Sequence, residues 1–71
     1  MNREEAYKKI GRNIQNQRKK QGYTQESFAE LMNVSWSYVS KVEAGYLNLS
    51  IGKLVDISNY LKIDLVKLIE N

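Results

Sequence analysis

Hydrophobic and polar residues are spaced along this 71-residue chain in a way that predicts helices. Ala6, Tyr7, Ile10 and Ile14 form an apolar stripe at helical spacing. The chain has no proline and only four glycines, so helix ends must be read from capping residues. Apolar and polar residues alternate over residues 47–51, which is compatible with a short strand, but no second strand is predicted to pair with it. We predict helices over residues 4–21, 25–32, 36–44, 51–61 and 65–70.

Four of the predicted helix starts share one pattern. Each has a Ser, Thr or Asp that can accept a backbone N–H bond, with an apolar residue just before it and another four positions later. These capping residues are Thr24, Ser35, Ser50 and Asp64. The helix ends agree, because Gly22, Asn33 and Gly45 tolerate the left-handed conformation that closes a helix. The predicted fold class is all-α.

Length and composition limit the class of protein. At 71 residues we expect one domain over residues 1–71, whose folding buries only about 60% of the surface of the unfolded chain. Without Cys or His, neither a disulfide nor a metal site is expected, and no cofactor is implied. The acidic residues are scattered and no Gly-rich phosphate loop is present, so we do not expect an enzyme. Apolar residues never occur more than two in a row, which predicts a cytoplasmic protein without a membrane span or secretory signal.

Positive charge is concentrated at the start of the chain. Residues 1–23 carry seven Lys or Arg and two Glu, residues 24–45 sum to −2, and residues 46–71 sum to zero. The run Arg18-Lys19-Lys20 suits an anionic polymer. The alternative is that these basic side chains only form a solvated helix face, and on charge alone this alternative is favoured over binding to an anionic polymer.

The segment from Gln25 to Ala44, QESFAELMNVSWSYVSKVEA, resembles the helix-turn-helix motif of the phage-repressor and Cro-like family of DNA-binding proteins. Ala29 is small where the next helix must cross, Asn33 tolerates a positive φ, and Val39 is one of the apolar residues that hold the two helices together. The resemblance covers roughly residues 10–69. It implies a compact five-helix, lambda-repressor-like domain in which the second and third helices form the motif.

Some residues depart from the family pattern. Ser27 stands where an acidic capping residue is common, Asn33 and Lys62 replace usual glycines, and Leu49 replaces a common proline. We expect these changes to weaken local turns without preventing the fold. Gln17 replaces a frequent Leu on the apolar side of the first helix, which predicts looser or partly hydrated packing there.

The helix over residues 36–44 is the candidate DNA reader. At about 100° per residue, Val39 and Val42 point into the protein, whereas Ser37, Ser40 and Lys41 point away. The resemblance implies that this outer face enters the major groove, which at about 12 Å wide admits a helix. The expected base-contacting residues, with the first two preferred, are Ser37, Lys41, Trp36, Ser40 and Tyr38.

Trp36 and Tyr38 lie on the two flanks of this face. Trp36 has a single N–H donor and cannot make a bidentate base contact, so packing on a thymine methyl or a sugar, or donation to a phosphate, is expected. Tyr38 has similar options. The alternative is that both rings lie flat over the helix crossing and complete a small core.

Further roles follow from the resemblance. The expected phosphate-binding residues are Gln25, Thr24, Asn48 and Tyr46. Gln25 matches the family's phosphate-binding glutamine, while for Tyr46 and Asn48 an ordinary solvated loop is the alternative. Arg18 and Glu43 match a family ion pair, which would tie the first helix to the third and act more as a positioning device than as a source of net stability.

The end of the chain has more apolar residues than one small core needs. They are Val55, Ile63, Val66 and Ile69. We expect a two-fold homodimer through about residues 55–71, because one module makes few base contacts and two can bind half-sites about 34 Å apart. The alternative is that all four residues close the monomer core.

The main hypothesis is a sequence-specific transcriptional regulator of double-stranded DNA, more a repressor than an activator, that binds an inverted-repeat operator. Phage repressors, restriction-modification controllers and antitoxins are all small family members, and these residues do not choose among them. No small-molecule ligand is implied. The alternatives are a protein-interaction module that uses the aromatic third helix, or a controller or antitoxin that acts with a partner protein.

Overall fold

The computed structural model describes residues 1–70, which form five helices and no strand. The helices are α1 (Arg3–Lys20), α2 (Gln25–Met32), α3 (Trp36–Ala44), α4 (Ile51–Leu61) and α5 (Val66–Ile69). The predicted all-α class and the bounds of α2, α3 and α4 are confirmed. α1 begins one residue earlier than predicted because the Asn2 side chain caps it, accepting from the Glu5 N–H at 2.9 Å.

Three of the four predicted N-caps are present. The side-chain oxygens of Thr24, Ser35 and Ser50 accept backbone N–H bonds at 3.0, 3.0 and 3.1 Å. The prediction for Asp64 is wrong, since Leu65 already has helical dihedral angles and no side chain caps the start of α5. Backbone bonds begin this short helix instead, including the Lys67 N–H to the Asp64 carbonyl at 3.0 Å.

The turn residues also correct one expectation. Ser27 does not weaken the start of α2, because its hydroxyl accepts from the Thr24 N–H at 2.9 Å and completes a reciprocal capping box. Asn33 and Lys62 both adopt the left-handed conformation with φ of 57°. Asn tolerates this conformation better than most residues, whereas Lys has no compensating property, so strain remains at the end of α4.

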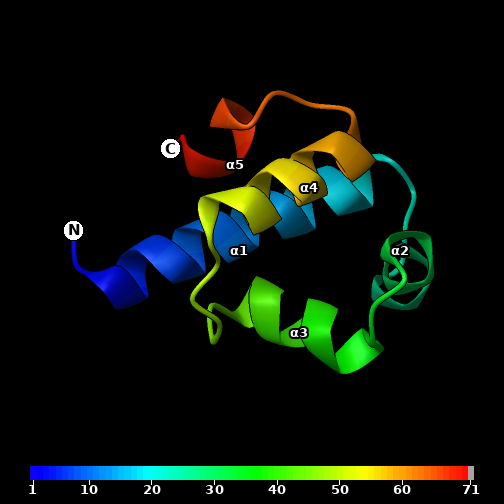
Figure 1. Cartoon of the computed structure of the whole chain (residues 1–71), viewed down its shortest axis with the longest axis horizontal. Coiled ribbons are helices and arrows are strands. Elements are labelled where there is room, and N and C mark those ends of the chain that lie inside the picture. The colour runs from blue at the N-terminus through cyan, green and yellow to red at the C-terminus, as the bar shows by residue number, and fades with distance from the viewer. Residues whose placement is uncertain (71) are drawn as a thin grey trace.

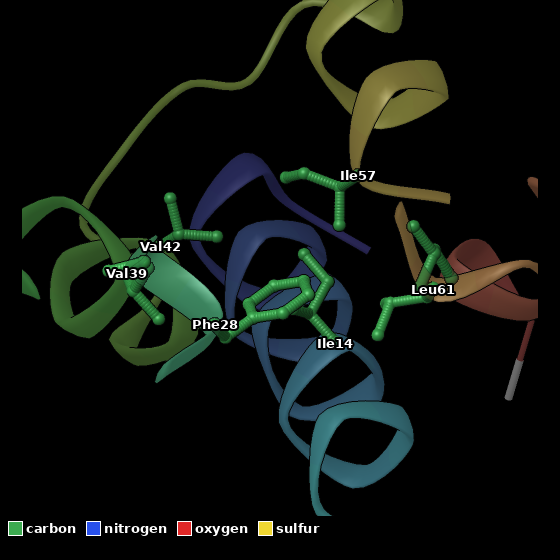
Figure 2. Packing of buried hydrophobic residues seen from close by; sticks show 8 residues of the cluster. Ile14, Phe28, Val39, Val42, Ile57 and Leu61 are labelled. Atoms are coloured by element: carbon green, nitrogen blue, oxygen red, sulfur yellow. The ribbon is translucent and has the colours of Figure 1, made fainter. Parts of the chain in front are cut away.

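The core lies where α1, α2, α3 and α4 meet (Figure 2), and Leu68 of α5 also belongs to it. Phe28 and Ile14 are at its centre, with Val39 and Val42 of α3 on one side and residues of α4 on the other. The buried apolar residues that form this cluster are Ile14, Phe28, Ala29, Val39, Val42, Ile57, Leu61 and Leu68. Each large side chain contributes about 1.5–3 kcal/mol through burial, so the core fixes the angle at which α3 is presented.

α1 runs through the fold and holds three other elements in place (Figure 1). Gly11 lets α3 approach closely, because a Cβ atom there would lie 2.5 Å from the Glu43 carbonyl oxygen. Asn13 Nδ2 donates to the carbonyls of Leu68 and Glu70 at 2.9 and 2.8 Å, which secures the end of α5. Gln17 is half-buried and lines a polar hollow beside these residues, in keeping with the looser packing expected on that side.

Candidate nucleic-acid interface

α3 presents one face to the core and the opposite face to solvent. Val39 and Val42 are 2% and 4% exposed. Ser37, Ser40 and Lys41 are all exposed. The outer face therefore consists of small side chains around one lysine, and nothing in residues 1–70 covers it.

Figure 1 shows α3 at one edge of the fold, with α4 and α5 toward the opposite edge. Helix α3, which carries the expected base-reading residues, therefore lies apart from α5, whereas Tyr38 borders a hollow that residues of α4 also line.

Arg18 and Glu43 join α1 to α3 beneath the exposed face. Arg18 Nε donates to Glu43 Oε2 at 2.6 Å, and a second guanidinium nitrogen donates to Oε1 at 2.9 Å. Their side chains are only 6% and 2% exposed. Arg18 also donates to the Tyr23 carbonyl at 2.8 Å, so one guanidinium group connects α1, the turn before α2, and α3. A bidentate pair of this kind restricts orientation as well as distance.

Gln25 extends this pair to the surface. Its Nε2 donates to Glu43 Oε1 at 3.0 Å, and its Oε1 accepts from Trp36 Nε1 at 3.0 Å. The chemistry of the partners fixes the orientation of the amide, because a carboxylate only accepts and an indole N–H only donates. One Nε2 hydrogen remains for another acceptor, so the expected phosphate contact of Gln25 stays a prediction.

Trp36 and Tyr38 have different surroundings on the two flanks of α3. Trp36 is 56% exposed and borders a hollow of about 320 Å³ that Gln25, Ser37 and Ser40 also line. Tyr38 is half-buried and packs against the core. The alternative of a core role therefore describes Tyr38 better than it describes Trp36.

The other expected phosphate-binding residues lie at the two ends of the motif. Tyr46 and Asn48 are exposed in the segment between α3 and α4, where Tyr46 is 76% exposed. Thr24 is exposed too, but its hydroxyl already caps α2. Thr24 is thus less free to contact a phosphate than Tyr46 or Asn48.

The apolar residues expected at a dimer interface are divided between the surface and the core. Val55 is 38% exposed, Val66 52% and Ile69 48%. Ile63 is only partly exposed and packs against the monomer core. Three of the four residues therefore leave apolar surface on α4 and α5.

Two features of the site were missed from the sequence. The bridge through Gln25 was missed because its partners are distant in sequence: Glu43 is 18 positions from Gln25 and Trp36 is 11 positions from it. Gly11 was not singled out, although a glycine inside a long predicted helix marks a position of close approach. Among residues 1–70, no helix is long and apolar enough to cross a membrane, and no group of residues is arranged to hold a metal ion.

Comparison with known proteins agrees with this geometry. The helix-turn-helix family HTH_3 matches residues 14–68. The restriction-modification controller protein C.AhdI from Aeromonas hydrophila is 31% identical, with a TM-score of 0.79, and the match covers 87% of this chain and 94% of that one. No curated protein gives a significant match.

Two further solved structures share the fold at lower identity. The clp gene regulator ClgR from C. glutamicum is 24% identical, with a TM-score of 0.82 over 89% of this chain and 82% of that one. The DNA-binding domain of BldD is 19% identical, with a TM-score of 0.87 over 99% of this chain and 100% of that one. The family match, the all-α fold and the exposed α3 lead to one conclusion: the chain belongs to the HTH_3 helix-turn-helix family of DNA-binding transcription regulators.

Proposed function

We propose that this protein is a sequence-specific transcriptional repressor that binds an inverted-repeat operator as a homodimer. The observation that carries the proposal is the exposed face of α3. Its residues Ser37, Ser40 and Lys41 are all exposed to solvent. A lysine donates to guanine O6 or N7, and a serine hydroxyl can bond to either donors or acceptors on base edges.

The support beneath α3 favours a reader of fixed geometry. The buried Arg18–Glu43 pair ties the last turn of α3 to α1, and Gln25 of α2 links Glu43 to Trp36 in the first turn. A reader that is already in place loses less conformational freedom when it binds, so more of the contact energy contributes to affinity. Tyr46 and Asn48, exposed after α3, are the proposed phosphate contacts together with the free hydrogen on Gln25 Nε2.

A controller of gene expression in a restriction-modification system is one specific form of this function. C.AhdI is such a controller, and it resembles this chain over nearly its whole length at 31% identity. We extend that role to this chain only as part of the proposal. The presence of methyltransferase and endonuclease genes beside its own gene would support it.

Selection of bound sites from random duplexes tests the proposal directly. The expected result is an inverted repeat with half-site centres about 34 Å apart. If selection enriches no sequence, the protein is not a sequence-specific regulator. A single enriched half-site without symmetry contradicts the homodimer while leaving the DNA-binding function in place.

A protein-interaction module remains the second candidate, and the exposed Trp36 and Tyr46 favour it. The dependence of binding on salt concentration distinguishes DNA binding from binding to another protein. Neutralising several phosphates makes DNA binding fall by orders of magnitude between about 50 and 200 mM salt, whereas an apolar protein contact changes little. Binding that is insensitive to salt would favour the interaction module.

A further inference from the structure

The indole of Trp36 is held in place by hydrogen bonding while most of its surface remains exposed. Its only donor, Nε1, is engaged by Gln25 Oε1 at 3.0 Å. Gln25 is in turn fixed by Glu43, whose carboxylate accepts two bonds from Arg18. Trp36 therefore cannot donate to a phosphate without breaking this chain of bonds, and apolar contact is what its exposed ring can offer.

The hollow beside the ring has the chemistry to receive an apolar group. It measures about 320 Å³, is lined mainly by apolar surface, and is bordered by Gln25, Trp36, Ser37 and Ser40. Ser37 and Ser40 belong to the exposed face of α3, so the hollow opens on the surface proposed to enter the major groove.

In the major groove, base edges present hydrogen-bond donors and acceptors except at one place, the C5-methyl group of a pyrimidine. Thymine carries this group, and 5-methylcytosine carries it at the same position. A flat ring beside a shallow apolar hollow fits a methyl group, and the ring itself has no free donor for a phosphate.

We propose that the hollow beside Trp36 is a subsite for the C5-methyl group of a pyrimidine and that Gln25 is its positioning residue. The inference rests on the proposed DNA-binding function and adds a determinant of specificity to it. Each half-site should then contain one pyrimidine whose methyl group contributes to affinity.

The test uses the operator obtained by selection and changes single methyl groups. In one series, each thymine is replaced in turn by uracil, which removes only the methyl group. In the other series, each cytosine is replaced by 5-methylcytosine. Affinity is measured for the wild type, Trp36→Ala, Gln25→Leu and, as a control on α4, Lys53→Ala.

We expect one position per half-site at which loss of the methyl group lowers affinity about fourfold, or about fifteenfold when both half-sites are changed. The ratio of methylated to unmethylated affinity should fall to about one in Trp36→Ala and decrease in Gln25→Leu, but stay unchanged in Lys53→Ala. If the role of Gln25 were purely structural, Gln25→Leu would lower the affinity for the methylated and the unmethylated operator equally, and the ratio of the two affinities would stay unchanged. If the methyl effect occurs when a thymine is replaced by uracil, the recognised methyl group is that of thymine. If it occurs when a cytosine is replaced by 5-methylcytosine, the recognised methyl group is that of the modified base.

Fluorescence gives a second measurement, because Trp36 is the only tryptophan in the chain. Its emission should change when the wild type binds the operator. The inference is overturned if the protein binds the operator but the Trp36 emission does not change. It is also overturned if no methyl effect is lost in Trp36→Ala. Either result leaves the proposed function intact. Failure to bind any selected duplex overturns both.

Discussion

Gly11 of α1 lies directly against the backbone of Glu43 in α3. A Cβ atom at Gly11 would be 2.5 Å from the Glu43 carbonyl oxygen and 2.6 Å from that of Val42. These are backbone atoms, which cannot move aside as the end of a flexible side chain can. The depth at which α3 sits on α1 is therefore set at this contact, next to the ion pair that sets its orientation.

Gly11→Ala should lower the free energy of unfolding by about 1–3 kcal/mol, because the added methyl group forces α1 and α3 apart. Denaturant unfolding measures this change. Gly52→Ala is the matched control, since the nearest atom to a Cβ there is Ser50 Oγ at 3.8 Å. The control should gain about 0.5–1 kcal/mol through helix propensity. Equal stabilities of the two variants would show that the close contact is unimportant.

Glu43→Ala should lower the free energy of unfolding by about 3–5 kcal/mol, because it leaves the buried Arg18 without its partner. The double variant Arg18→Met with Glu43→Leu should regain much of this loss, since neither charge is then buried. Glu30→Ala, an exposed change on α2, should shift stability by less than about 0.5 kcal/mol. A Glu43→Ala protein that melts like the wild type would mean that the pair does not tie α1 to α3 in solution.

Lys62→Gly should raise the free energy of unfolding by about 1 kcal/mol, because φ at this position is 57° and a left-handed conformation is costly for a residue with a Cβ atom. Lys62→Ala removes the same charge but keeps the Cβ atom. Its stability should therefore stay near that of the wild type. If the alanine variant gains as much as the glycine variant, the effect comes from charge and not from backbone strain.

Lys41→Ala should reduce operator affinity by about 1–3 kcal/mol and relax base preference at one position per half-site. Competition between operator and random duplexes measures both quantities. Lys53→Ala removes the same charge from an exposed position on α4 and should leave base preference unchanged. Equal losses for Lys41→Ala on operator and random DNA would identify it as a phosphate contact.

Ile69→Lys should shift the protein from dimer to monomer in sedimentation at micromolar concentration. Ile69 is 48% exposed in the monomer, so a lysine there should not disturb the core but would place a charge in a buried apolar interface. Leu31→Lys is a control of similar exposure on α2 and should leave the association state unchanged. A wild-type protein that sediments as a monomer would contradict the proposed dimer.

Local chemistry along the chain was sufficient to predict much of the fold. Capping hydroxyls predicted where α2, α3 and α4 begin, and the turn residues Asn33 and Gly45 predicted where α2 and α3 end, because a cap acts on a backbone group only a few residues away. The spacing of Val39 and Val42 likewise predicted which side of α3 is buried, since residues three apart share a helix face. The same reasoning failed at Asp64, whose side chain makes no cap, and α5 begins with backbone bonds such as the one from the Lys67 N–H to the Asp64 carbonyl.

The arrangement of the site depended on distances between helices, which no local pattern contains. The bonds from Glu43 through Gln25 to Trp36 exist because α2 and α3 pack at one particular angle, and this angle follows from the whole core. The division of Trp36 and Tyr38 into an exposed and a half-buried ring has the same origin. Sequence spacing places side chains around one helix, whereas packing against other helices determines which of them meet.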